Sequence, residues 1–151
     1  MKHAPLIVLL SIALFSCADD PTDVPEVTIK LDELTKGSWK FTGYMADYDQ
    51  DGVFDEDFYP NWEDCYKDNL YTFQLNDSMI KEEGPNRCIG EIQTQISAWS
   101  FSDNQTRLQW FQFGLSDHHI EELSPTTMRL KSETVHNLFY KKDIEMTFSK
   151  Q

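Results

Sequence analysis

The chain has 151 residues, and its 26 acidic against 13 basic side chains give a net charge of -13. Phosphate binding requires a stripe of basic side chains, so this charge argues against nucleic acid as a partner. The length suits a single domain, and an aromatic content of 13% argues against a disordered chain.

A short apolar segment lies next to the N-terminus. Lys2 and His3 precede an apolar run from Leu6 to Phe15. A transmembrane helix requires roughly 20 apolar residues, so a run of about ten is typical of the central region of a signal peptide. Residues 1–16 are therefore predicted to form a signal peptide that directs export.

The residues Leu14-Phe15-Ser16-Cys17 resemble the lipobox of bacterial lipoproteins. In that family the cysteine is acylated, palmitate included, and becomes the first residue after cleavage. The resemblance implies that Cys17 anchors the protein to the outer membrane of a Gram-negative bacterium, and the acidic residues Asp19 and Asp20 favour its outer face. The alternative is a secretory signal that is cleaved elsewhere, with Cys17 as an ordinary thiol.

Residues 17–33 contain prolines and acidic residues and few large apolar groups. This composition predicts a flexible, extended tether between the lipid and the domain. About one helical turn fits between Leu31 and Lys36, and Gly37 would end it. Residues 34–151 are predicted to form the folded domain.

From residue 39 onward apolar residues recur with a period of two, which is typical of half-buried strands. In the first strand Trp39, Phe41 and Met45 are expected on one face and Tyr44 on the other. About eight short strands without a long helix predict an all-β domain, either an antiparallel up-and-down barrel or, less favourably, a sandwich. The candidate strands are 39–45, 71–75, 78–83, 95–101, 107–113, 118–123, 127–131, 136–140 and 144–148.

Several segments resemble a known family. Gly37-Ser38-Trp39 resembles the G-x-W signature of lipocalins, and residues 65–73, 82–84 and 120–130 are similar, in the same order, to small lipocalin-like domains of bacterial lipoproteins. The resemblance implies an up-and-down barrel plugged at one end by Trp39, with Arg129 as the candidate to stack on that ring. It implies no particular ligand, because a fold does not determine a function.

Three cysteines are an odd number for an exported protein. Lipidation of Cys17 would leave Cys65 and Cys88 as a pair, and a disulfide between them would stabilise the fold by roughly 3 kcal/mol. The family resemblance implies the same bridge. The alternative is two buried free thiols.

Residues 47–57 have the spacing of a calcium loop, with acids at positions 1, 3, 5 and 9 and glycine at position 6. Phe58 occupies position 12, where an EF-hand has glutamate, so a neighbouring acid would have to complete the coordination. A structural calcium ion is predicted, and the alternative is a mobile acidic loop without an ion. The predicted ligands are Asp47, Asp49, Asp51, Asp55, Asp57 and the backbone carbonyl of Val53.

No motif predicts catalysis. His118 and His119 are neighbours on a predicted strand, so they point to opposite faces and cannot easily share a metal ion. Glu82 and Glu83 are likewise expected on opposite faces, which does not suit two carboxylates that act on one bond. The chain is therefore not expected to be an enzyme.

Two functions are compatible with these patterns. The first is a monomeric, lipid-anchored barrel that binds a small apolar or amphipathic ligand at its open end, with calcium stabilising one loop. The second is a barrel with a filled interior that displays Trp62 and the acidic loop to a protein or glycan partner at the cell surface. The candidate ligand contacts in the interior are Trp39, Phe41, Tyr71, Phe73, Trp99, Phe101, Trp110 and Phe113.

Overall fold

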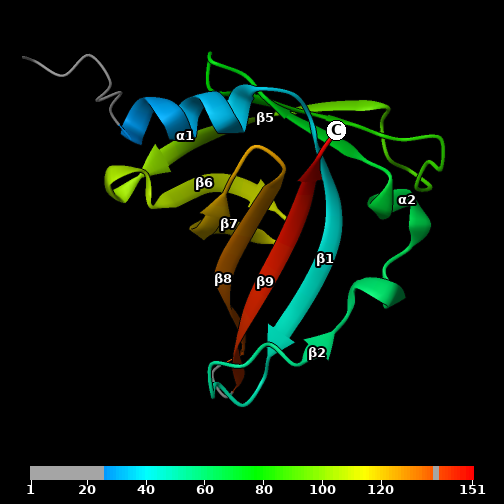
Figure 1. The fold of residues 1–151 in the computed structure, drawn as a ribbon. Helices are drawn as coiled ribbons and strands as arrows, with labels where there is room; N and C mark the ends of the chain where they lie inside the picture. Colours follow the sequence, from blue (N-terminus) through cyan, green and yellow to red (C-terminus); the bar gives the residue numbers. More distant parts are fainter. Residues whose placement is uncertain (1–25, 138–139) are drawn as a thin grey trace, which may run out of the picture.

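The computed structural model describes residues 26–137 and 140–151, and these form one antiparallel sheet that closes into a barrel (Figure 1). Strand order follows the sequence from β3 to β9, and pairing of β1 with both β3 and β9 completes the ring. The predicted up-and-down barrel is confirmed. The strands are β1 (Trp39–Asp47), β2 (Glu56–Asp57), β3 (Leu70–Phe73), β4 (Ser78–Glu82), β5 (Thr94–Ser102), β6 (Arg107–Gln112), β7 (Leu115–Leu123), β8 (Thr127–Asn137) and β9 (Tyr140–Lys150).

Helical segments are short. The α-helices are α1 (Glu26–Thr35) and α2 (Asp64–Lys67), and the 3-10 turns are η1 (Tyr59–Asn61) and η2 (Asp103–Gln105). In the described part of the chain, no helix has the length and apolar character needed to cross a membrane.

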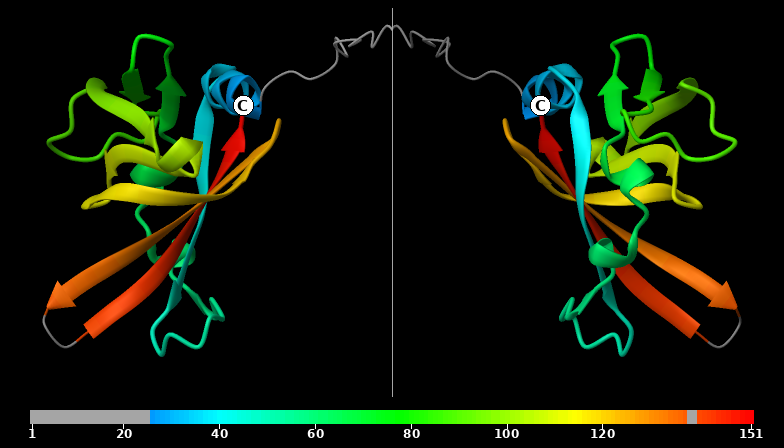
Figure 2. Two further views of the ribbon diagram at one scale, coloured as in Figure 1. Left: turned by 90° about the vertical axis from the view of Figure 1, so that its left-hand side faces the viewer. Right: turned by 90° about the vertical axis from the view of Figure 1, so that its right-hand side faces the viewer.

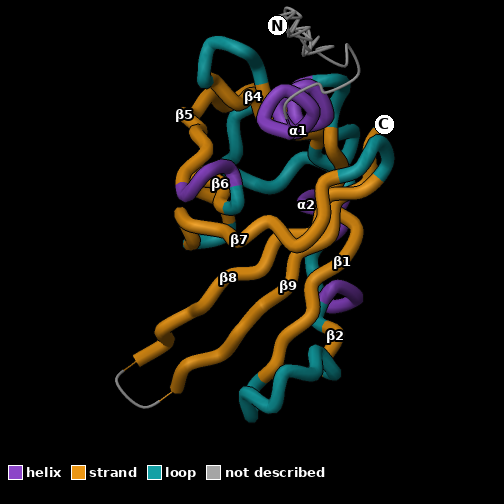
Figure 3. The backbone as a smooth tube through the Cα atoms, turned by 60° about the vertical axis from the view of Figure 1, so that its left-hand side comes forward, coloured by secondary structure: helices purple, strands orange, loops and turns teal. Residues whose placement is uncertain are grey.

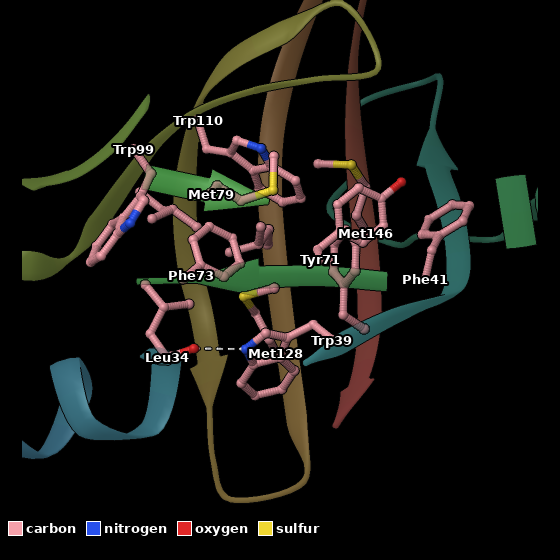
Figure 4. Packing of buried hydrophobic residues seen from close by; sticks show 13 residues of the cluster. Leu34, Trp39, Phe41, Tyr71, Phe73, Met79, Trp99, Trp110, Met128 and Met146 are labelled. Atoms are coloured by element: carbon pink, nitrogen blue, oxygen red, sulfur yellow. Dashed lines mark hydrogen bonds between the residues drawn. The ribbon is translucent and has the colours of Figure 1, made fainter. Parts of the chain in front are cut away.

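The end of the barrel covered by α1 is closed by Trp39 (Figure 4). The Trp39 ring is fully buried, and its Nε1 donates a 2.9 Å hydrogen bond to the carbonyl of Leu34 at the end of the helix. The ammonium group of Lys150 lies 4.6 Å from the centre of the Trp39 ring. The stacking cation is therefore Lys150 and not Arg129, which instead forms ion pairs with Glu122 and Glu145.

The extended tether predicted for residues 17–33 is wrong for residues 26–33, which are helical. Residues 26–33 belong to the helix, because Leu31 and Leu34 pack against the core at the closed end. A ten-residue helix is marginal on its own in water, and docking of its apolar face stabilises it. Cys17 and the predicted signal peptide lie outside the described residues.

Aromatic side chains fill the interior. Phe73 lies 5.1 Å from Trp110 and 5.6 Å from Trp99, measured between ring centres, and Tyr71 lies 5.3 Å from Trp110. All eight aromatic residues predicted to line the interior belong to this core. Trp39, Phe41, Tyr71, Phe73, Trp99 and Trp110 are buried, whereas Phe101 and Phe113 are half-buried and pack against the others.

A β-bulge in β1 corrects the predicted facing of its second half. The pairing with β9 shifts between Phe41 and Gly43, so Tyr44 pairs with Met146 and Met45 with Glu145. A bulge adds one residue to one strand and reverses the alternation that follows it. Tyr44 therefore faces the same side of the sheet as Phe41, and Met45 faces the other side.

The predicted disulfide is confirmed. Cys65 in α2 is bonded to Cys88 in the connection between β4 and β5. The bridge fixes the connection between β2 and β3 to the connection between β4 and β5.

Strands β8 and β9 continue beyond the rest of the barrel as a two-stranded arm (Figures 2 and 3). The arm begins where β1 ends, at the end of the barrel away from α1. That end is the open one, and the candidate site lies there.

Candidate functional site

A cleft of about 370 Å³ lies at the open end of the barrel and is called the mouth cleft here. Its lining comes from the end of β1 and the residue that follows it, the start of β9, and the connection between β2 and β3, which runs beside β1 (Figure 1). Five of the eight lining side chains are aromatic. The lining residues are Tyr44, Tyr48, Phe58, Asn61, Trp62, Glu63, Tyr66 and Lys142.

Incomplete strand pairing brings the aromatic connection into place. Strand β1 pairs with β3 only through Trp39 and Lys40. Beyond that point the connection takes over, because the Phe58 N–H donates to the carbonyl of Tyr44 (2.9 Å) and the Tyr59 hydroxyl donates to the carbonyl of Phe41 (3.2 Å). The segment that carries Trp62 and Tyr66 is thus held against the inward side of β1.

Trp62 packs directly against the aromatic core at the inner side of the mouth cleft. Its ring centre is 5.5 Å from that of Phe41 and 4.6 Å from that of Phe113, which lies in the turn between β6 and β7. Phe41 belongs to the core and Trp62 to the cleft. A ligand in the cleft would therefore contact the outer side of these packed rings and would not enter the barrel.

The aromatic rings of the cleft are inclined to one another. Tyr44 and Trp62 are 5.4 Å apart at an interplanar angle of 58°, and Trp62 and Tyr66 are 5.6 Å apart at 85°. Tyr48 and Phe58 are 5.8 Å apart at 66°. Tyr48 is exposed and the other four rings are half-buried, so a bound molecule can reach them.

The side chains that line the cleft include one ammonium group, that of Lys142. Burial, assisted by nearby Tyr48, raises the pKa of Tyr44, so its hydroxyl stays protonated and neutral. The Nζ of Lys142 lies 4.9 Å from the ring centre of Tyr48 and 5.7 Å from that of Phe58. It also donates a 3.2 Å hydrogen bond to the Tyr48 hydroxyl.

The predicted calcium loop lies beside the cleft. Carboxylate oxygens of Asp47, Asp49 and Asp51 all lie within 4.8 Å of one another, so these three can share a cation geometrically. Asp47 is almost fully buried and accepts backbone hydrogen bonds from Gln50 (2.7 Å) and Gly52 (3.0 Å). A positive φ of 90° at Gly52 permits the sharp turn.

The other predicted ligands do not join that group of three. Asp55 and Val53 are exposed, and Asp57 is also exposed and accepts a hydrogen bond from the backbone N–H of Tyr59 (3.0 Å). Coordination by these groups would require the loop to move, and calcium at this loop stays a prediction.

The two adjacent histidines face opposite sides of β7, as predicted. His118 is fully buried, whereas His119 is exposed and pairs with Glu121. The His118 Nε2 lies 2.7 Å from the carbonyl of Trp110, which can only accept, so Nε2 carries the proton and Nδ1 accepts from the Ser132 hydroxyl at 2.6 Å. Burial lowers the pKa of His118.

A serine that donates to a histidine is also the arrangement of a catalytic nucleophile and its base. Here Ser132 is only 3% exposed and His118 is 0% exposed, and the imidazole is oriented by a backbone carbonyl. The pair satisfies two polar groups inside the core. It offers no route by which a substrate could reach the hydroxyl.

A larger hollow of about 490 Å³ lies on the outer face of β6, β7 and β8. We favour the mouth cleft over it as the functional site because both cationic side chains that line the hollow are used in ion pairs with their neighbours. These pairs are Arg107 with Asp117 at 2.6 Å and Lys131 with Asp143 at 2.9 Å.

Comparison with known proteins gives no matching family model and no similar curated protein. The functional argument therefore depends on the geometry of the site itself.

Of the cleft residues, sequence reasoning singled out only Trp62. Tyr44 was missed because the bulge that turns it inward depends on the pairing with β9. Lys142 was missed because it is brought to the cleft from the far end of the chain. The available signal was the density of aromatic residues between β1 and β3: Tyr48, Phe54, Phe58, Tyr59, Trp62 and Tyr66.

Proposed function

We propose that this protein is a non-enzymatic binding protein of the cell envelope that takes a small amphipathic molecule into the mouth cleft. The observation that carries the proposal is the convergence of five aromatic side chains with Asn61, Glu63 and Lys142 around one opening. Binding pockets commonly combine mainly apolar and aromatic walls with a few polar groups, and their volumes begin at about 300 Å³. The mouth cleft meets both conditions.

The packing of the barrel favours the mouth cleft over the barrel interior as the ligand-binding site. The interior aromatic rings contact one another, and Phe41 and Phe113 both pack against Trp62 at the inner side of the cleft. The barrel would then act as a rigid support for the cleft, since sites built on packed elements hold their geometry best. A protein or glycan partner would use the same walls, because Trp62 is one of them.

Binding of N-phenyl-1-naphthylamine, a neutral apolar fluorophore, tests the proposal. We expect saturable binding by the wild-type protein, and an affinity at least tenfold lower in Trp62→Ala, because a large aromatic contact is lost. Phe111→Ala is the matched control, since Phe111 is an aromatic side chain that is 67% exposed on the outer face. Saturable binding that survives Trp62→Ala, or no binding at all, would contradict the proposal.

The second part of the proposal is a calcium ion bound by the acidic loop. Three carboxylates that converge beside the cleft support it, since calcium prefers oxygen ligands. Tyr48 follows Asp47 directly, so an ion there would also hold one wall of the cleft. This role is structural, because the loop is not placed near a reacting group.

Thermal unfolding with calcium and with a chelator tests the ion. At a calcium concentration about 100 times the dissociation constant, the native state gains about 2.7 kcal/mol, and we expect the Tm to rise by about 5 to 10 °C. Asp49→Asn should abolish the rise. Asp32→Asn, which removes the same charge from an exposed position in α1, should retain it. Equal Tm values in calcium and chelator would reject the site.

A further inference from the structure

The mouth cleft already holds a cation. The ammonium group of Lys142 is seated over the rings of Tyr48 and Phe58, at 4.9 Å and 5.7 Å from their centres. Attraction between a cation and the face of an aromatic ring is effective within about 6 Å. Two of the five rings therefore present their faces to positive charge in this structure.

The remaining walls extend the same environment. Tyr44, Trp62 and Tyr66 form two further ring pairs with inclined planes, at 58° and 85°. All three side chains line the same cleft as Tyr48 and Phe58, and clusters of aromatic side chains recognise quaternary ammonium groups. Glu63 adds a carboxylate to the same lining.

The charge of the molecule favours the same ligand class. The net charge is -13, and the acidic loop beside the cleft carries the converging carboxylates of Asp47, Asp49 and Asp51. Such a field attracts cations and repels anions. Lys142 is the one basic residue among the residues that line the cleft, so the local surroundings do not reverse this sign.

We infer that the ligand of the mouth cleft is an organic cation that carries a methylated ammonium group, and that Lys142 occupies its place until the ligand arrives. The inference rests on the proposed function, because it names the class of the amphipathic ligand. A quaternary ammonium group, in which every N–H is replaced by carbon, donates no hydrogen bonds and is held by ring faces, whereas the lysine ammonium is strongly hydrated and can return to water. The flexible stem of Lys142 allows that exchange.

The test compares choline with its neutral isostere 3,3-dimethylbutan-1-ol, in which carbon replaces the charged nitrogen. Binding is followed through the NMR chemical shift of the Trp62 indole N–H, assigned with Trp62→Phe. We expect choline to bind at least tenfold more tightly than the isostere at fixed ionic strength. The sodium salt of 3,3-dimethylbutyrate serves as the anionic probe and should bind more weakly than choline.

Lys142→Met separates the two roles that the lysine could have. If its ammonium competes with the ligand, the variant should bind choline about two- to fivefold more tightly, which corresponds to one cation–π contact. If the lysine instead recruits an anion, the variant should lose affinity for the butyrate. Lys36→Met removes the same charge at the closed end of the barrel and should change neither affinity.

The outcomes distinguish this inference from the proposed function. Equal affinity for choline and its isostere, weaker choline binding by Lys142→Met, or a shift caused by maltose but not by choline would overturn the organic cation. Binding of the neutral fluorophore would still uphold an amphipathic cleft in each of those cases. Absence of fluorophore binding in a protein that still binds choline would count against the apolar part of the proposed function alone, and absence of both would overturn both.

Discussion

Replacing Trp39 by alanine is expected to lower the free energy of unfolding by about 3 to 5 kcal/mol, measured by urea denaturation. Trp39 is fully buried at the closed end of the barrel, where its ring contacts the core and its Nε1 bonds to the carbonyl of Leu34. Removing the ring leaves a large cavity under α1 and an unpaired acceptor at the end of the helix.

Two further variants keep this prediction testable if Trp39→Ala does not fold. Trp39→Phe retains an aromatic ring but loses the hydrogen bond, so it should cost less than the alanine variant, and its own cost should include about 1 kcal/mol for the lost bond. Phe111→Ala removes an exposed aromatic side chain and should change stability by only about 0.5 kcal/mol. A loss below about 1 kcal/mol in Trp39→Ala would contradict closure of the barrel by this residue.

Replacing Cys17 by serine is expected to abolish incorporation of radiolabelled palmitate and to release the protein from the membrane fraction. Each buried methylene of an acyl chain contributes about 0.8 kcal/mol, so several chains make an anchor that is effectively permanent. A single sulfur atom is thus predicted to decide between membrane-bound and soluble protein. Expression of the full chain in a Gram-negative host allows both measurements on one preparation.

The control for Cys17→Ser is the double variant Cys65→Ser with Cys88→Ser. It removes both sulfurs of the disulfide and should retain the label, because neither cysteine follows an apolar segment. Label that remains in Cys17→Ser, or that never appears in the wild-type protein, would contradict the lipoprotein interpretation.

The sequence was sufficient to predict the sheet, the disulfide bridge and the opposite facing of neighbouring strand residues. Alternation of apolar and polar side chains predicts strands because successive residues of a strand point to opposite faces. The same rule predicted that His118 and His119 face opposite sides, as observed, but it did not say which of them is buried. The Cys65 to Cys88 bridge followed from the cysteine count and the resemblance, and the structure confirms it.

Three features required the tertiary structure. Helix α1 begins at Glu26 because the closed end of the barrel offers Leu31 and Leu34 an apolar surface, and composition alone predicted an extended segment. Phe111 follows the buried Trp110 in β6 and is 67% exposed, so the described chain covers only one face of that strand at this point. The bulge that turns Tyr44 inward is defined only by the partner strand β9.

The sequence by itself determined a β-barrel with one disulfide, a strongly acidic surface and an N-terminal segment predicted to carry lipid. Only the tertiary structure decided where a ligand could bind, because the mouth cleft joins Tyr44, Trp62 and Lys142 from three separate parts of the chain. Contacts between residues so far apart depend on strand register and on how the chain closes the barrel. The periodicity of a single segment predicts neither the strand register nor the closure of the barrel. Alternation along one strand does predict which face of that strand is buried.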